Sequence, residues 1–241
     1  PYLSRGLGMC IRDRNMAAVV LDGVSFEGND AVDGDGGGAL LSDITSLTLT
    51  DVSFTDNTAS VDGGGLLTTA ITTLTADGVV LDGNMAGDNG GGWNTESDAT
   101  ITDVLATNND AYYGGGLYLS ASVQIDDSEL SDNTAEKAGA VYIASSAELL
   151  IENSLLDTNS STRQGSTVHI ERGGVLELAT STVSHNTGFG AAIFLNSSSS
   201  TELFVDSTDF IDNANADVYA RGWYSAGPNA SFECDGIGGC Q

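Results

Sequence analysis

Two aspartates beside a run of glycines are the first residues in this sequence that could do chemistry. They lie in the stretch DGDGGGALL, from Asp33 to Leu41. Glycine-rich loops can cradle phosphate, aspartates can bind calcium, and both residue types also form sharp corners in repetitive folds. No lysine follows the glycines and no helical pattern begins there, which argues against a phosphate site. We expect Asp33 and Asp35 either to bind calcium, the only cofactor that the sequence suggests, or to be solvated turn residues.

Adjacent carboxylates and histidines are the other candidates for catalysis. Asp126 and Asp127 are neighbours, but an acidic residue recurs at this place along the chain, which favours a turn feature over a catalytic pair. His169 and His185 have no serine or cysteine nucleophile in a recognisable pattern. The sequence therefore identifies no catalytic residue, and an enzyme is the less favoured interpretation.

The charge balance argues against a nucleic-acid partner, and the distribution of apolar residues argues against a membrane-spanning segment. The chain has 241 residues, of which 34 are Asp or Glu and 7 are Lys or Arg, so its formal net charge is −27. Because affinity for phosphate backbones comes from Lys and Arg, we do not expect a nucleic-acid partner. The sequence has no apolar run of about 18 residues, so we expect no membrane-spanning segment.

Two motifs recur in step along the chain and predict its architecture. Glycine triplets begin at Gly36, Gly63, Gly90 and Gly114, and weaker versions continue to about residue 220. Between them recurs an apolar residue with Asn three positions later, as in FEGN, FTDN and LSDN. Each unit of about 25 residues holds three short stretches of alternating apolar and polar residues, which indicate strands. The sequence predicts an all-β, single-domain parallel β-helix (solenoid) of about eight three-stranded coils.

Three columns of residues are expected to fill the interior of the coils. The fourth residue of each unit, counted from the glycine motif, is apolar throughout, and the sixth is mostly apolar. Their side chains point the same way, because side chains alternate along a strand. The third column lies three residues before each Asn of the second motif: Phe26, Phe54, Leu81, Leu105, Leu130, Leu156, Val183 and Phe210.

The asparagines of the second motif form a further column. Stacked coils place equivalent side chains about 4.8 Å apart, where amides can hydrogen-bond to one another. Asn also tolerates the left-handed conformation of a sharp corner. We therefore expect a structural ladder, and we expect Asn133→Leu to lower the thermal stability. Its members are Asn29, Asn57, Asn84, Asn108, Asn133, Asn159, Asn186 and Asn213.

The fifth residue of each unit is expected to face outward, between the two core columns. In the later units this column consists of rings: Tyr118, Tyr142, His169, Phe194 and Tyr219. An exposed aromatic stripe is unusual for a soluble surface and suggests a platform for a glycan or a protein. The alternative is that the rings stack on one another or lie under a loop. These five residues are the candidate ligand-binding residues.

The paired motifs resemble the repeats of the polymorphic outer membrane proteins. FTDN and FEGN match the first element of that repeat, and GGGALL and GGGLYL match the second. The resemblance covers residues 19 to 220, although later units such as GSTVHI and NADVYA have lost the glycines. It implies a right-handed parallel β-helix, exposure on a bacterial surface and adhesion, and it brings no catalytic residues.

These observations lead to one favoured function and one alternative. We expect a non-catalytic scaffold, extracellular or on a bacterial cell surface, that binds a surface glycan or a protein along one face. The alternative is a secreted carbohydrate-active enzyme, either a polysaccharide lyase or a glycoside hydrolase. The chain is expected to be a monomeric fragment of a larger secreted protein.

Both ends of the chain are expected to differ from the repeats. Residues 9–14, MCIRDR, match the translation of a transposon end used in sequencing libraries, so residues 1–14 are expected to be a non-native or disordered leader. The β-helix is then expected over residues 15–241, with an irregular cap at 221–241. Cys234 and Cys240 are separated by a glycine-rich loop and predict a disulfide, which implies an oxidising compartment.

Overall fold

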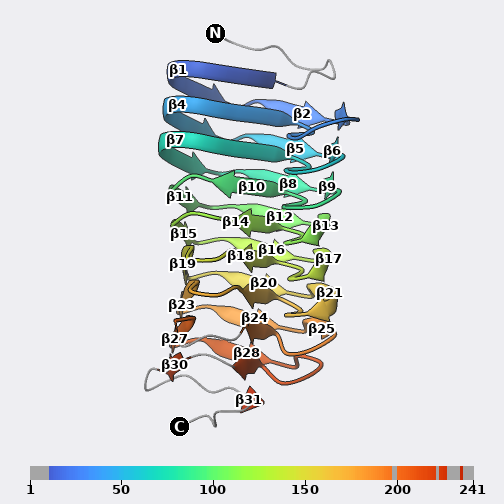
Figure 1. Cartoon of the computed structure of the whole chain (residues 1–241), viewed down its shortest axis with the longest axis vertical. Coiled ribbons are helices and arrows are strands. Elements are labelled where there is room, and N and C mark those ends of the chain that lie inside the picture. Colours follow the sequence, from blue (N-terminus) through green and yellow to red (C-terminus); the bar gives the residue numbers. More distant parts are fainter. Residues whose placement is uncertain (1–10, 197–199, 221–222, 227–233, 236–241) are drawn as a thin grey trace.

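The computed structural model describes residues 11–196, 200–220, 223–226 and 234–235. In this part of the chain every regular element is a β-strand, and successive coils pair through parallel strands. The coils stack along the long axis of the molecule (Figure 1). The predicted all-β parallel β-helix is confirmed.

The first sheet has 16 strands and divides into two arms. In the first coils one long strand spans both arms: β1 (Ile11–Asp22), β4 (Ala39–Thr50) and β7 (Leu66–Asp77). After β7 the first arm continues as β10 (Trp93–Glu96), β14 (Leu117–Leu119), β18 (Val141–Ile143), β22 (Val168–Ile170), β26 (Ile193–Leu195), β29 (Val218–Ala220) and β31 (Cys234–Asp235). The second arm continues as β11 (Ala99–Thr102), β15 (Val123–Asp126), β19 (Glu148–Glu152), β23 (Val175–Ala179), β27 (Glu202–Asp206) and β30 (Trp223–Ala226).

Two smaller sheets complete each coil. The second sheet has eight strands: β2 (Ser25–Glu27), β5 (Ser53–Thr55), β8 (Val80–Asp82), β12 (Leu105–Thr107), β16 (Glu129–Ser131), β20 (Leu155–Asp157), β24 (Thr182–Ser184) and β28 (Asp209–Ile211). The third sheet has seven: β3 (Asp30–Ala31), β6 (Thr58–Ala59), β9 (Met85–Ala86), β13 (Asp110–Tyr113), β17 (Thr134–Lys137), β21 (Ser160–Gln164) and β25 (Thr187–Gly188). Each of these two sheets takes at most one strand from each coil.

The core columns from the first arm lie in the interior as predicted. Leu66, Val141 and Val168 of the fourth column are fully buried, as are Leu41 and Ile143 of the sixth. Polar members of these columns are paired with one another. The Trp93 indole Nε1 donates to Thr68 Oγ1 at 2.9 Å, and Thr68 Oγ1 donates to Thr95 Oγ1 at 2.9 Å. Buried hydrogen-bonding groups therefore fit this core because each finds a partner in the neighbouring coil.

The third core column contains one wrong prediction. Leu105 is 37% exposed, whereas Ala106 is fully buried and pairs with Leu81 of the preceding coil. The register of β12 is thus one residue further along than the repeat motif indicated. A shift of one residue moves a side chain to the opposite face of a strand, so Ala106 fills the interior position and Leu105 faces out.

A ladder of buried asparagines runs along the corner between the second and third sheets. Within it Asn57 Nδ2 donates to Asn84 Oδ1 at 3.0 Å, and the backbone N–H of Asn57 donates to the same oxygen at 3.0 Å. From Asn57 onward each Nδ2 also donates to a backbone carbonyl of the preceding coil, as Asn84 does to Phe54 O. The members are Asn29, Asn57, Asn84, Asn109, Asn133, Asn159, Asn186 and Asn213.

The ladder corrects two further predictions. Asn109 occupies the place predicted for Asn108, which is exposed and hydrogen-bonds through Nδ2 to Asp82 Oδ1. The left-handed backbone belongs to the residue before each ladder Asn, as at Asp56 with φ of 52° and Asn108 with φ of 56°. The sharp turn of the backbone therefore lies one residue before each ladder Asn, and the Asn side-chain amide hydrogen-bonds along the ladder.

A second polar ladder was not predicted from the sequence. It runs along the corner between the second arm and the second sheet, where Ser128 N donates to Ser154 Oγ and Ser154 N donates to Ser181 Oγ, both at 3.1 Å. Val52 and Val79 are buried at the equivalent corner of earlier coils. The corner therefore changes from apolar packing to hydroxyl hydrogen bonds along the solenoid.

The ends fall partly outside the described residues. Strand β1 begins at Ile11 and pairs with β4 from Ala39 onward, so residues 11–14 of the predicted leader lie in a coil. Cys240 of the predicted disulfide lies outside the described residues, as does most of the predicted cap. Among the described residues no helix has the length and apolar character needed to cross a membrane.

Candidate functional site

The five candidate ring residues form one stacked column on the first arm. Strand pairing sets Tyr118, Tyr142, His169, Phe194 and Tyr219 side by side in successive coils. Their ring centroids are 4.9 to 5.3 Å apart and their planes are nearly parallel. This spacing is that of the coils, so each ring contacts the next across most of its face.

The column is not the exposed stripe that the sequence predicted. His169 is fully buried, and Tyr142 and Phe194 are 6% and 8% exposed. Tyr113, the residue before a glycine corner, packs against Tyr142 with their ring centroids 5.0 Å apart, and the corner itself runs close to the base of the column. A Cβ on Gly114 would lie 3.1 Å from Tyr142 Cβ, and one on Gly165 would lie 3.2 Å from Phe194 Cβ. The rings therefore stabilise the coil stack and do not form an open platform.

Glu171 connects three coils beside this column. Tyr142 Oη donates to its Oε1 at 2.6 Å, Asn196 Nδ2 donates to its Oε2 at 2.6 Å, and His169 Nε2 lies 3.3 Å from Oε1. Lys137 Nζ, the ammonium of the only lysine, is 3.9 Å from Oε1. Hydrogen bonds, first that from His169, lower the pKa of Glu171 to about 2. Burial lowers the pKa of His169, which favours the neutral imidazole.

We expect Tyr142→Phe to destabilise the fold by about 1.5 kcal/mol, because it removes a hydrogen bond to a charged carboxylate and keeps the ring. Chemical denaturation followed by circular dichroism measures this loss. Tyr118→Phe is the matched control, since Tyr118 stacks on Tyr142 and the described residues provide no hydrogen-bond partner for its hydroxyl. Equal losses in the two variants would show that the hydroxyl of Tyr142 has no special role.

The two candidate calcium ligands are not part of a metal-binding cluster. Asp33 is exposed, and Asp35 Oδ1 accepts the backbone N–H of Asp62 at 3.4 Å. Asp62 Oδ1 in turn accepts the backbone N–H of Asn89 at 3.0 Å and its Nδ2 at 2.8 Å. Across the described residues no three His, Cys, Asp or Glu side chains are grouped as a metal site would need. Asp35 thus lies in a corner ladder with Asp62 and Asn89, Asp33 faces solvent, and the calcium hypothesis gains no support there.

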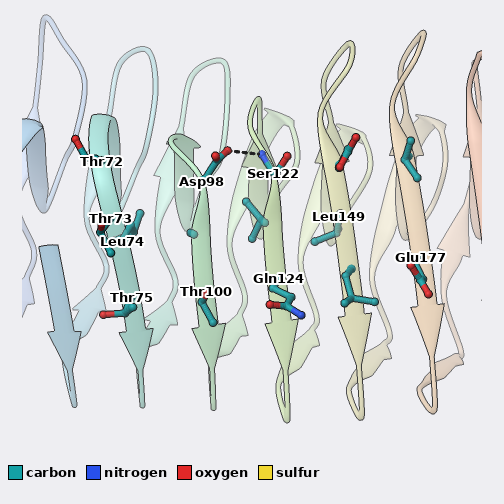
Figure 2. A pocket seen from close by; sticks show the side chains of 15 residues that line it. Thr72, Thr73, Leu74, Thr75, Asp98, Thr100, Ser122, Gln124, Leu149 and Glu177 are labelled. Carbon is teal, nitrogen blue, oxygen red and sulfur yellow. Dashed lines mark hydrogen bonds between the residues drawn. The ribbon is translucent and has the colours of Figure 1, made fainter. Parts of the chain in front are cut away.

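A shallow groove crosses the outer face of the second arm (Figure 2). It has a volume of about 510 Å³ and extends over five consecutive coils, from β7 to β23. Its floor is a row of outward-facing side chains that strand pairing holds in register: Thr75, Thr100, Gln124, Leu150 and Glu177. The inward neighbours, such as Leu74 and Ile101, are buried in the core. The strands therefore fix a regular array of hydroxyl, amide, apolar and carboxylate groups.

Three carboxylates give the groove a negative charge. Asp98, Glu148 and Glu177 are among its 15 lining residues, none of which is Lys or Arg. The Ser122 N–H donates to Asp98 Oδ1 at 2.9 Å and holds this carboxylate at the rim, as the dashed line in Figure 2 shows. In the described part of the chain Glu148 and Glu177 form no salt bridge.

This groove was not predicted from the sequence. The ring column of the first arm was the predicted binding surface, and the alternating stretches of the second arm predicted strands only. The signal was nevertheless present, because Thr75, Thr100 and Gln124 each stand between two core residues of those stretches. What alternation could not show is that the face remains uncovered, which depends on where the corners of the coil pass.

Comparison with known proteins agrees with the fold. A family model described as "Right handed beta helix region" matches residues 4–156. No curated protein and no solved structure matches the chain. The predicted right-handed parallel β-helix is therefore confirmed, whereas the finer resemblance to the polymorphic outer membrane protein repeat stays a prediction.

Proposed function

Since the chain belongs to the family of right-handed β-helix regions, we propose that it is a non-catalytic extracellular or cell-surface scaffold. It binds a glycan or a protein in the groove of the second arm, rather than on the ring column. The observation that supports this is the in-register row of Thr75, Thr100 and Gln124 on an uncovered sheet face. A repeating array of this kind suits a ligand that is itself extended and repetitive.

The open form of the site favours binding over catalysis. Active sites are usually concave pockets in which a few polar groups converge on one point. Here the polar groups are spread over five coils along a shallow groove. Such an arrangement can bind an extended ligand through many contacts along its length. It does not bring several polar groups together at a single bond of the ligand.

A glycoside hydrolase is the second candidate, because the groove contains carboxylates. Glycoside hydrolysis uses a pair of carboxyl groups, one as acid and one as base or nucleophile. Asp98, Glu148 and Glu177 are the residues that could supply such a pair. A lyase for acidic sugars fits less well, since no lining residue is basic and could offset the charge of the substrate.

Removing hydrogen-bonding groups from the floor should weaken binding. We expect the double variant Thr100→Val, Gln124→Ala to bind its polysaccharide about tenfold more weakly, the loss expected for one to two hydrogen bonds. The measurement is a titration against neutral, anionic and amino-bearing polysaccharides and against short basic and acidic peptides, with calcium and with EDTA. Thr55→Val is the matched control, because Thr55 is a strand threonine on the second sheet, outside the groove.

The same experiment separates the candidates. If the wild-type protein released new reducing ends from a polysaccharide, and Glu148→Gln or Glu177→Gln abolished this release, the protein would be a hydrolase and not a scaffold. If the groove variant and the wild type bound every ligand with equal affinity, the groove would not be the binding surface.

A further inference from the structure

The groove of the second arm is better suited to a glycan than to an extended peptide. Peptides that bind β-sheets as an added strand need a free sheet edge with unpaired backbone groups. The strands β11, β15 and β19 each pair with a neighbour on both sides, so the groove offers side chains only. Hydroxyl and amide side chains such as Thr100 and Gln124 can hydrogen-bond sugar hydroxyls, and half-buried Leu150 can contact the apolar face of a sugar ring.

The charges around the floor select among glycans. Asp98 and Glu148 lie towards one side of the groove and Glu177 belongs to its floor, with no basic residue among the lining side chains. A polyanionic glycan would be repelled by the carboxylates that three of the five coils contribute to the groove. An ammonium group would instead form charge-assisted hydrogen bonds with these carboxylates, which are about twice as strong as neutral ones.

We infer that the groove binds a polysaccharide that bears free amino groups. This inference rests on the proposed function and names the class of ligand for the same site. In the bound state the floor hydroxyls and the Gln124 amide hold the sugar hydroxyls, and Glu148 and Glu177 hold the ammonium groups. The regular spacing of the coils lets successive sugars contact equivalent positions along the solenoid axis.

The test compares chitosan oligosaccharides with fully N-acetylated chitin oligosaccharides of the same length, at a pH that keeps the amines protonated. The two ligands differ only in the charge and acetylation of the amino group. We expect the amino form to bind at least tenfold more tightly at low salt, and we expect the ratio to shrink at high salt because ions screen exposed charges. Oligogalacturonides should not bind measurably.

Two single variants locate the effect in the groove. Glu148→Gln and Glu177→Gln should each reduce the preference for the amino form about three- to tenfold. Glu27→Gln removes the same charge from an exposed strand residue of the second sheet and should leave the preference unchanged. This control separates the groove from the general attraction of an acidic protein for polycations.

Several results would overturn the inference. Equal affinity for the amino and N-acetylated forms would show that the groove binds glycans without a preference for charged amino groups. Tighter groove-dependent binding of oligolysine would indicate a basic protein partner. A loss in Glu27→Gln as large as in the groove variants would indicate non-specific attraction. Binding of no ligand in the panel would overturn the proposed function as well.

Discussion

Asn109→Ala should lower the free energy of unfolding by about 4 kcal/mol, whereas Asn108→Ala should lower it by about 1 kcal/mol. The first variant removes four hydrogen bonds in the interior. Asn109 Oδ1 accepts from the backbone N–H and Nδ2 of Asn84, and its Nδ2 donates to Leu81 O and Asn133 Oδ1. Buried groups left without a partner carry a desolvation penalty of about 1 to 3 kcal/mol each, and some recover water on relaxation.

The neighbouring asparagine is the matched control. The Asn108 side chain is exposed and hydrogen-bonds only to the half-buried Asp82 side chain, and Asn108 has φ of 56°, where alanine is moderately disfavoured. Chemical denaturation followed by circular dichroism measures both losses. If Asn108→Ala proved the more destabilising variant, the register of this corner would be the one that the repeat motif suggested, and Ala106 would not be the core residue.

The repeating pattern was sufficient to predict the architecture because a β-helix is nearly one-dimensional. Once the glycine corners and the Asn motif define the unit, stacking identical units leaves little choice of topology. The columns that contain Leu66 and Leu41 could be assigned from alternation alone. The predicted register failed at Leu105 and Asn108, where LATNN contains two consecutive asparagines and the motif fits in either register.

The functional surface was harder to predict, for a physical reason. Alternation tells which side of a strand a side chain leaves, but it does not tell whether another part of the chain covers that side. On the first arm the corner at Gly114 approaches Tyr142 closely, and on the second arm the row through Thr100 remains open. Aromatic residues therefore marked the covered face, and small polar residues marked the accessible one.

Glu171→Gln should lower the free energy of unfolding by about 2 kcal/mol at pH 7. The pKa of Glu171 falls from 4.5 to about 2 in the fold, because His169, Tyr142 and Asn196 hydrogen-bond to its carboxylate. A shift of this size corresponds to about 3 kcal/mol, reduced here because the side chain is 21% exposed and solvent screens part of the interaction. Glutamine keeps the shape but turns its amide N–H groups towards other donors.

The effect should depend on pH in a defined direction. A carboxyl whose pKa is lowered by folding stabilises the protein fully above its unfolded pKa, near 4.5, and this contribution is lost as the pH falls towards 2. The difference in stability between wild type and Glu171→Gln should therefore be constant from pH 7 to 5 and shrink between pH 4.5 and 2.5. Glu27→Gln, at an exposed site, should differ little from wild type throughout. A Glu171→Gln deficit that persisted undiminished at pH 2.5 would mean that Glu171 acts by packing and not by its charge.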